Sequence, residues 1–118
     1  MNKERRKSIR IKKQIDAQYQ HIINDKTVWI TVLVNDISEA GACVLIDRFP
    51  LIGEEIILRL RTPLNPGEWL QVNTKVIDVD KYMTNTYFAR LHFIDLQVEY
   101  KERIREYIDF YLKREKRL

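Results

Sequence analysis

Apolar and polar residues alternate along much of the chain, and this period-two pattern predicts β-strands. The clearest run occupies every second position with the apolar residues Val28, Ile30, Val32 and Val34. The same alternation recurs across residues 54–62 and 86–94. Because successive side chains of a strand point to opposite faces, each run is expected to bury one face and expose the other.

About six such runs divide the first part of the chain into short strands. They predict strands near residues 15–23, 27–36, 42–47, 54–62, 68–80 and 86–94. The segments between them contain turn-forming residues: a hairpin turn at 24–26, loops at 49–53 and 63–67, and a polar connection at 81–86. Successive strands with short connections predict a mainly β, antiparallel barrel or sandwich.

The spacing of apolar residues changes after the last predicted strand. Residues with helical spacing follow, with charged residues between them: Leu96, Tyr100, Ile104, Tyr107, Ile108 and Tyr111. This pattern predicts an amphipathic helix of about five turns that lies across the barrel. The basic residues at the end of this segment suit the negative end of a helix dipole.

The composition fits one domain of 118 residues, with 45% hydrophobic residues. We expect a basic flexible arm at 1–13, a barrel at 14–95 and a helix at 96–118. No apolar run approaches the roughly 18 residues of a membrane-spanning helix, and no apolar stretch follows the N-terminal charges. Together with the single cysteine, this predicts a cytoplasmic location without membrane insertion.

Positive charge is concentrated at the two ends of the chain. The net charge is +4, but residues 1–13 sum to +6, residues 113–118 to +3 and the body between them to −5. A protein that binds nucleic acid over a broad surface would be more uniformly basic. The distribution therefore favours a local anion site near the N-terminus.

Candidate catalytic residues are few, so the sequence does not predict an enzyme. His21 and His92 show no metal-ligand spacing, and no second cysteine accompanies Cys43. The pattern predicts a surface position for His92 and a buried one for Cys43. The chain has three glycines and no glycine-rich phosphate loop. Acid–base, nucleophilic and metal-assisted catalysis therefore have no predicted site.

Two short motifs contain the candidate ligand-binding residues. The first is R-x-x-x-R, formed by Arg6 and Arg10 and directly preceded by Arg5. The second is D-x-S-x-x-G at 36–41, after an apolar strand. Each has a simple alternative interpretation. The first resembles a solvated basic tail, and the second a loop whose polar side chains bind backbone amides and whose glycine supplies a positive φ.

Taken together, in this order and about 30 residues apart, the motifs resemble those of the PilZ domain family. The resemblance extends to Leu51-Ile52-Gly53-Glu54-Glu55, to residues 88–93 and to the C-terminal helix. It implies a six-stranded antiparallel β-barrel that binds cyclic di-GMP, a bacterial second messenger, and needs no other cofactor. It also implies an adaptor that signals to a partner protein, such as flagellar, exopolysaccharide or regulatory machinery. The implied ligand-binding residues are Arg5, Arg6, Arg10, Asp36, Ser38 and Gly41.

The chemistry of these residue types agrees with that implication. The planar guanidinium groups of Arg6 and Arg10 can bind phosphate oxygens, or the O6 and N7 of guanine, with two hydrogen bonds each. Asp36 can accept hydrogen bonds from the N1–H and amino group of guanine, and Ser38 can donate or accept. A glycine at position 41 would allow close approach of the backbone to the ligand. In this family, an arginine at position 5 implies a pair of ligand molecules.

One feature departs from some members of the family, which place an aromatic residue late in the fifth strand. Here that segment reads Val76-Ile77-Asp78-Val79, and neither Trp29 nor Trp69 can be assigned to the site from the sequence. Arg90 is a candidate to stack on guanine instead. Two other functions remain open: a PilZ-like protein scaffold that does not bind the nucleotide, and a small RNA-binding barrel, which the acidic body disfavours.

Overall fold

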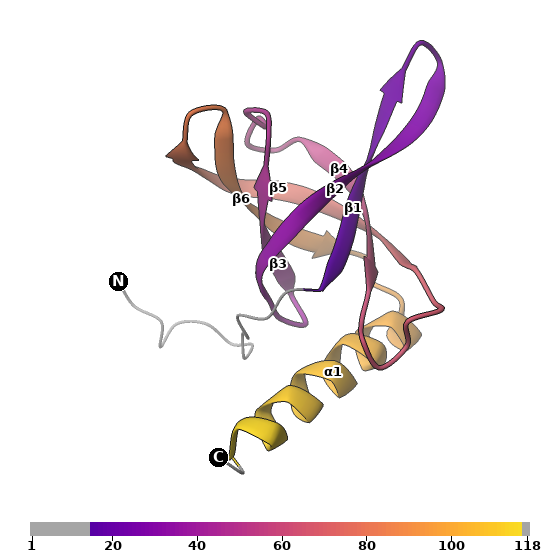
Figure 1. The fold of residues 1–118 in the computed structure, drawn as a ribbon. Coiled ribbons are helices and arrows are strands. Elements are labelled where there is room, and N and C mark those ends of the chain that lie inside the picture. Colours follow the sequence, from indigo (N-terminus) through magenta and orange to yellow (C-terminus); the bar gives the residue numbers. More distant parts are fainter. Residues whose placement is uncertain (1–14, 117–118) are drawn as a thin grey trace.

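The computed structural model describes residues 15–116, which form six strands and one helix (Figure 1). The strands are β1 (Asp16–Ile23), β2 (Lys26–Ile37), β3 (Gly41–Ile46), β4 (Glu55–Arg61), β5 (Leu70–Met83) and β6 (Thr86–Ile94), and the helix is α1 (Val98–Lys116). No helix in this described part of the chain is long and apolar enough to cross a membrane.

The six strands close into an antiparallel barrel in the order β1-β2-β3-β6-β5-β4. The predicted fold class is therefore confirmed, and a barrel, not a sandwich, is formed. The β1–β2 hairpin turns through Asn24 and Asp25, which have φ values of 52° and 62°. Such left-handed pairs match the twist of the adjoining strands, as the predicted turn required.

One predicted connection is wrong. Residues 81–86 were expected to form a polar connection, yet β5 continues to Met83 and pairs there with Thr86. Only Thr84 and Asn85 form the turn, and Asn85 has a φ of 61°. An asparagine tolerates this conformation, so two residues suffice and the paired strands extend beyond the barrel.

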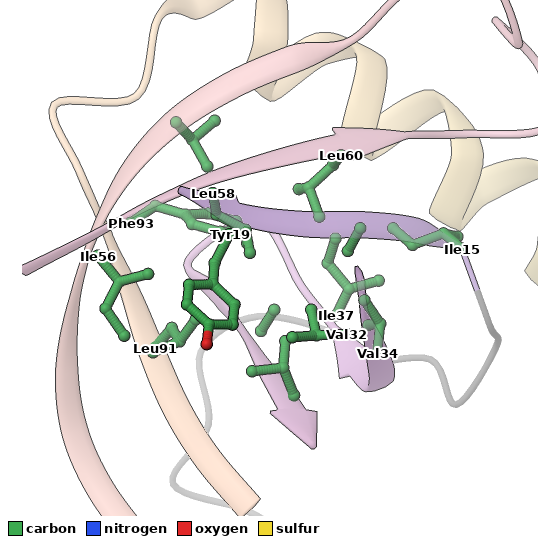
Figure 2. Close-up of a cluster of buried hydrophobic side chains, with 14 of the residues drawn as sticks. Ile15, Tyr19, Val32, Val34, Ile37, Ile56, Leu58, Leu60, Leu91 and Phe93 are labelled. Carbon is green, nitrogen blue, oxygen red and sulfur yellow. The ribbon is translucent and has the colours of Figure 1, made fainter. Parts of the chain in front are cut away.

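The barrel core is built from the inward faces that the alternation predicted. Ile56, Leu58 and Leu60 of β4 are buried, as are Ala89, Leu91 and Phe93 of β6. Figure 2 shows side chains from the different strands converging inside the barrel. Ile104, Tyr107 and Ile108 of α1 join the same buried cluster, which confirms the predicted apolar face of the helix.

The antiparallel order separates the connections into two groups. The β2–β3 and β4–β5 connections lie at the end of the barrel where α1 packs, which we call the helix end (Figure 1). The β1–β2, β3–β4 and β5–β6 connections lie at the opposite end, the hairpin end. The D-x-S-x-x-G motif lies at the helix end because it forms the β2–β3 connection.

Candidate functional site

The structure places half of the predicted ligand-binding residues. Asp36, Ser38 and Gly41 lie at the end of β2, in the following turn and at the start of β3. Arg5, Arg6 and Arg10 lie outside the described residues, as does the predicted arm at 1–13. The description begins at residue 15, directly before β1, and β1 starts at the helix end (Figure 1).

A β-bulge at the end of β2 determines where Asp36 points. Val34 pairs with Val44, but the next registered pair is Asp36 with Cys43, so Asn35 is the extra residue. Without this bulge, Asp36 would share the core-facing side of Val34. With it, Ile37 takes the core position, completely buried, and Asp36 lies on the outer side of the barrel. Bulges commonly re-aim a side chain in this way.

Asp36 is nevertheless well shielded, with 5% of its surface exposed. The side-chain amide of Asn35 donates a hydrogen bond to its Oδ2 over 3.2 Å. A buried carboxylate requires hydrogen-bond donors around it. The surroundings therefore suit an acceptor that is held in place before it meets a ligand.

Ser38 organises the turn between β2 and β3. Its backbone N–H donates to the carbonyl of Gly41 over 2.8 Å, and its Oγ accepts the N–H of Ala40 over 3.2 Å. The Ser38 hydroxyl also lies 3.4 Å from the Gly41 carbonyl, as a donor. Because Ser38 is completely buried, the geometry gives it a role in closing the turn.

Gly41 is required by the approach of β3 to β6. A Cβ at this position would lie 2.1 Å from the carbonyl oxygen of Leu91, a backbone atom that cannot swing away. Gly53, and not Gly41, is the glycine with a positive φ among the described residues, so the alternative interpretation of the motif as a loop whose glycine supplies a positive φ is wrong. The close approach observed here is to the barrel's own backbone.

A row of outward-facing residues crosses the barrel beside Asp36. Register pairs connect Asp36 with Cys43, Cys43 with Arg90, and Arg90 with Asp78. A second bulge, between Val76 and Asp78, sets the position of the last member. The row thus places an arginine two strands from Asp36, on the same side of the barrel.

Arg90 has unused hydrogen-bonding capacity in this row. Its Nη1 is buried and has no hydrogen-bond partner among the described residues. A buried guanidinium nitrogen without an acceptor is costly, and a bound anion or guanine edge would relieve that cost. Arg90 is therefore the residue of this face with the clearest need for an acceptor.

The next outward row lies closer to the helix end. Gly41 pairs with His92, and His92 with Lys75. His92 is exposed, as predicted, and Cys43 is buried, as predicted. Lys75 and Arg90 are the cations of these two rows on β5 and β6. No group of acidic, histidine or cysteine side chains within residues 15–116 has the geometry of a metal site.

The motif turn is also attached to α1 by an ion pair. Arg105 Nε and Nη2 donate to the two carboxylate oxygens of Glu39, each over 3.1 Å. These hydrogen bonds lower the pKa of Glu39, with the nearby charges of Arg105 and Lys101 acting in the same direction and desolvation opposing them. A change in the conformation of the turn would therefore alter this ion pair between the turn and α1.

The two tryptophans lie on a different face. Arg59 stacks over the ring of Trp29 at 4.3 Å and over that of Trp69 at 4.4 Å. A cleft of about 400 Å³ adjoins Trp69 and Arg61, and none of the motif residues that the structure describes, Asp36, Ser38 and Gly41, lines it. The structure thus brings neither tryptophan to the rows around Asp36.

The role of Asp78 and the two bulges that align the row were not predicted from the sequence. A signal was present, because the core-facing set changes from even to odd numbers: Val34 is followed by Ile37, and Val76 by Val79. A shift in period-two alternation indicates a bulge, and bulges are frequent beside functional sites.

The fold and this polar turn define a small antiparallel barrel with an arginine-rich segment before β1. The chain belongs to the PilZ domain family, whose match covers residues 4–110 and includes all three N-terminal arginines. No curated protein matches the chain.

Solved structures share the fold at low sequence identity. The inhibitor of motility MotI (DgrA) of Bacillus subtilis has a TM-score of 0.74 and 17% identity, and the match covers 92% of this chain and 52% of that one. YcgR of Escherichia coli in complex with c-di-GMP has a TM-score of 0.69 and 18% identity, covering 96% and 48%. The chain thus spans about half the length of these proteins. The PilZ domain of YcgR with c-di-GMP, at 0.68 and 16%, is covered over 95% of its length and 96% of this chain.

Proposed function

We propose that this protein is a cyclic di-GMP receptor that acts as an adaptor, without enzymatic activity of its own. Membership of the PilZ domain family and the presence of both motifs support this proposal. So does the likeness to the PilZ domain of YcgR, which was solved with c-di-GMP. The observation that carries it is the outward row from Asp36 to Arg90, next to the motif turn.

The ligand offers two kinds of group to this site. Its two phosphodiesters are anions, which Arg6 and Arg10 suit because each guanidinium can form paired hydrogen bonds. Its guanines offer donors to Asp36 and acceptors to Arg90, whose flat guanidinium can also stack on a base. Ser38 and Gly41 support the site by fixing the turn and the strand on which Asp36 stands.

Signalling would follow from ordering of the N-terminal segment against the barrel. The charge of +6 in residues 1–13 repels itself, and the ligand supplies the missing anionic charge. The ligand would bind this segment and the Asp36–Gly41 turn together, which creates a surface that a partner protein can recognise. The ion pair from Glu39 to Arg105 gives the same turn a connection to α1.

Calorimetric titration with cyclic di-GMP tests the proposal directly. We expect saturable binding, with GMP and cyclic di-AMP as controls that bind more weakly. We further propose two ligand molecules per chain, because Arg5 adds charge beside Arg6 and four phosphates packed together need it. Saturation at one ligand per chain would reject the second ligand molecule and leave the receptor proposal intact. Absence of binding by a folded protein would reject the receptor and leave a nucleotide-independent scaffold.

A further inference from the structure

The hairpin end of the barrel exposes large apolar side chains that the core does not use. Seven of the twelve exposed large hydrophobic residues within the described part of the chain lie in its β3–β4 connection or at the strand ends beside its two hairpin turns. We call this surface the apolar rim: Ile22, Ile23, Phe49, Leu51, Ile52, Tyr82 and Met83. Exposed apolar residues that gather in this way mark interaction sites, whereas scattered ones are ordinary.

The β3–β4 loop holds the most exposed members of the rim in a fixed shape. Leu51 and Ile52 are 67% and 69% exposed. Glu54 receives two hydrogen bonds from Arg48, over 2.6 and 3.2 Å, and one from the N–H of Leu51 over 3.1 Å.

Backbone hydrogen bonds fasten the same loop to β5. The Gly53 N–H donates to the carbonyl of Val76 over 2.7 Å, and the Val76 N–H donates to the carbonyl of Glu54 over 2.8 Å. Gly53, with a φ of 92°, permits the turn. A loop that is already ordered loses little conformational entropy when it binds. Its exposed side chains are thus presented ready for a contact.

An aromatic contact joins this loop to the β5–β6 hairpin, because the rings of Phe49 and Tyr87 lie 5.2 Å apart. Within the hairpin, the rings of Tyr82 and Phe88 lie 5.0 Å apart. On the other side, a groove of about 520 Å³ separates the loop from the β1–β2 hairpin and is lined by Ile22, Arg48 and Ile57, among others. The rim therefore combines a projecting apolar loop with an adjoining groove.

Charge indicates what kind of partner fits. The three connections with their adjoining strand ends, residues 22–27, 47–55 and 80–87, sum to −2. Anionic lipid surfaces attract basic segments, so a membrane is disfavoured. Pairing of two copies through this face would bring like charges together, which disfavours a dimer. A protein surface that is apolar at its centre and basic at its edge would complement both the apolar side chains and the negative charge of the rim.

We infer that the apolar rim is the docking surface for a partner protein with an apolar, basic-edged face. The inference deepens the adaptor part of the proposed function and rests on it, but it does not depend on cyclic di-GMP being the ligand. It places the partner at the hairpin end, away from the motif turn at the helix end. Aromatic and large aliphatic residues in such a position commonly dominate binding.

A pair of amphipathic helical peptides tests this chemistry. One is built from leucine and lysine and the other from leucine and glutamate, and each is titrated into ¹⁵N-labelled protein with and without saturating cyclic di-GMP. We expect the lysine peptide, in at least one of the two states, to shift amide signals in residues 22–26, 47–55 and 80–87. Equal binding of the glutamate peptide, or shifts centred on the helix end, would overturn the inference.

Matched variants make the test specific to the rim. The double variant Leu51→Ser/Ile52→Ser should weaken binding of the lysine peptide roughly tenfold or more. Leu64→Ser/Val98→Ser, at exposed apolar positions outside the rim, should not. Sedimentation and vesicle flotation complete the experiment. Self-association or binding to anionic vesicles that disappears in the first double variant would assign the rim to a second copy or to lipid, and reject the inference.

Both double variants should bind cyclic di-GMP with wild-type affinity, measured by calorimetry. This outcome separates the two proposals. Peptide binding without nucleotide binding would reject the receptor and keep the docking surface, and the reverse result would keep the receptor alone. Failure of the lysine peptide to bind in either nucleotide state would overturn the docking inference.

Discussion

The two ends of the barrel are constructed differently. At the helix end, Asp36 and Ser38 are buried in a hydrogen-bonded turn that α1 braces through Arg105. At the hairpin end, Leu51 and Ile52 are exposed on a loop that Glu54 holds. One end thus buries polar groups, which is suited to recognising a small polar ligand. The other exposes apolar groups, which is suited to a protein surface.

Gly41→Ala should have the largest effect on stability, because it disrupts the packing of β3 against β6 at the helix end. The added Cβ would meet the Leu91 carbonyl at 2.1 Å, so strands β3 and β6 must separate. We expect a loss of about 3 kcal/mol or more in the free energy of unfolding, measured by urea denaturation. Gly67→Ala is the control, because nothing lies within 4 Å of its added Cβ. Equal stabilities for the two variants would contradict the steric argument.

Arg6→Ala and Arg10→Ala should each weaken cyclic di-GMP binding by roughly 10- to 100-fold, since a charge-assisted hydrogen bond contributes about 1.5–3 kcal/mol. The unfolding free energy should stay unchanged, which circular dichroism can verify. Lys81→Ala removes a cation from the hairpin end instead and should leave the affinity as it is. Wild-type affinity in both arginine variants would show that the ligand does not use the R-x-x-x-R motif.

Asp36→Ala should change selectivity more than Arg6→Ala does. Contacts to a guanine edge discriminate between bases, whereas phosphate contacts act on any cyclic dinucleotide. We expect the preference for cyclic di-GMP over cyclic di-AMP to fall about tenfold in Asp36→Ala. Competition titrations on the two variants provide the comparison. A greater loss of preference in Arg6→Ala would reverse the assignment of base and phosphate recognition.

Glu54→Gln should have the smallest effect, and it should depend on pH. The hydrogen bonds from Arg48 lower the pKa of Glu54, with a further contribution from the Leu51 N–H, while desolvation opposes them. A lowered pKa stabilises the fold above the unfolded pKa of about 4.3, and this stability is lost as pH falls through the folded pKa. The variant should be less stable by at most about 1 kcal/mol at pH 7.

Denaturation of wild type and Glu54→Gln at neutral and acidic pH checks the sign of this effect. The difference between them should shrink toward zero as the carboxylate becomes protonated. Glu39→Gln should behave in the same direction, because Arg105 lowers the pKa of Glu39. A difference that grows on acidification would mean that the ion pair does not stabilise the loop.

Most of the fold could be predicted because alternation records which face of a strand is buried. The alternation failed at residues 81–86, because the paired strands there extend beyond the core and both of their faces are largely exposed, so no alternating pattern marks them. The two motifs were visible in the sequence, but the location of Asp36 on the outer side depends on one extra residue, Asn35. Arg90 and Asp78 join it only through register across three strand pairs, which no local pattern encodes.

The contact between Gly41 and the Leu91 carbonyl bears on how other members of the family should be interpreted. If the glycine is needed for the barrel to close, a descendant that no longer binds a nucleotide still has to keep it. The glycine of D-x-S-x-x-G would then indicate the barrel fold, and its presence would not predict whether a protein binds the nucleotide. We expect the aspartate and the N-terminal arginines to be the positions that distinguish nucleotide-binding members of the family from members that do not bind the nucleotide.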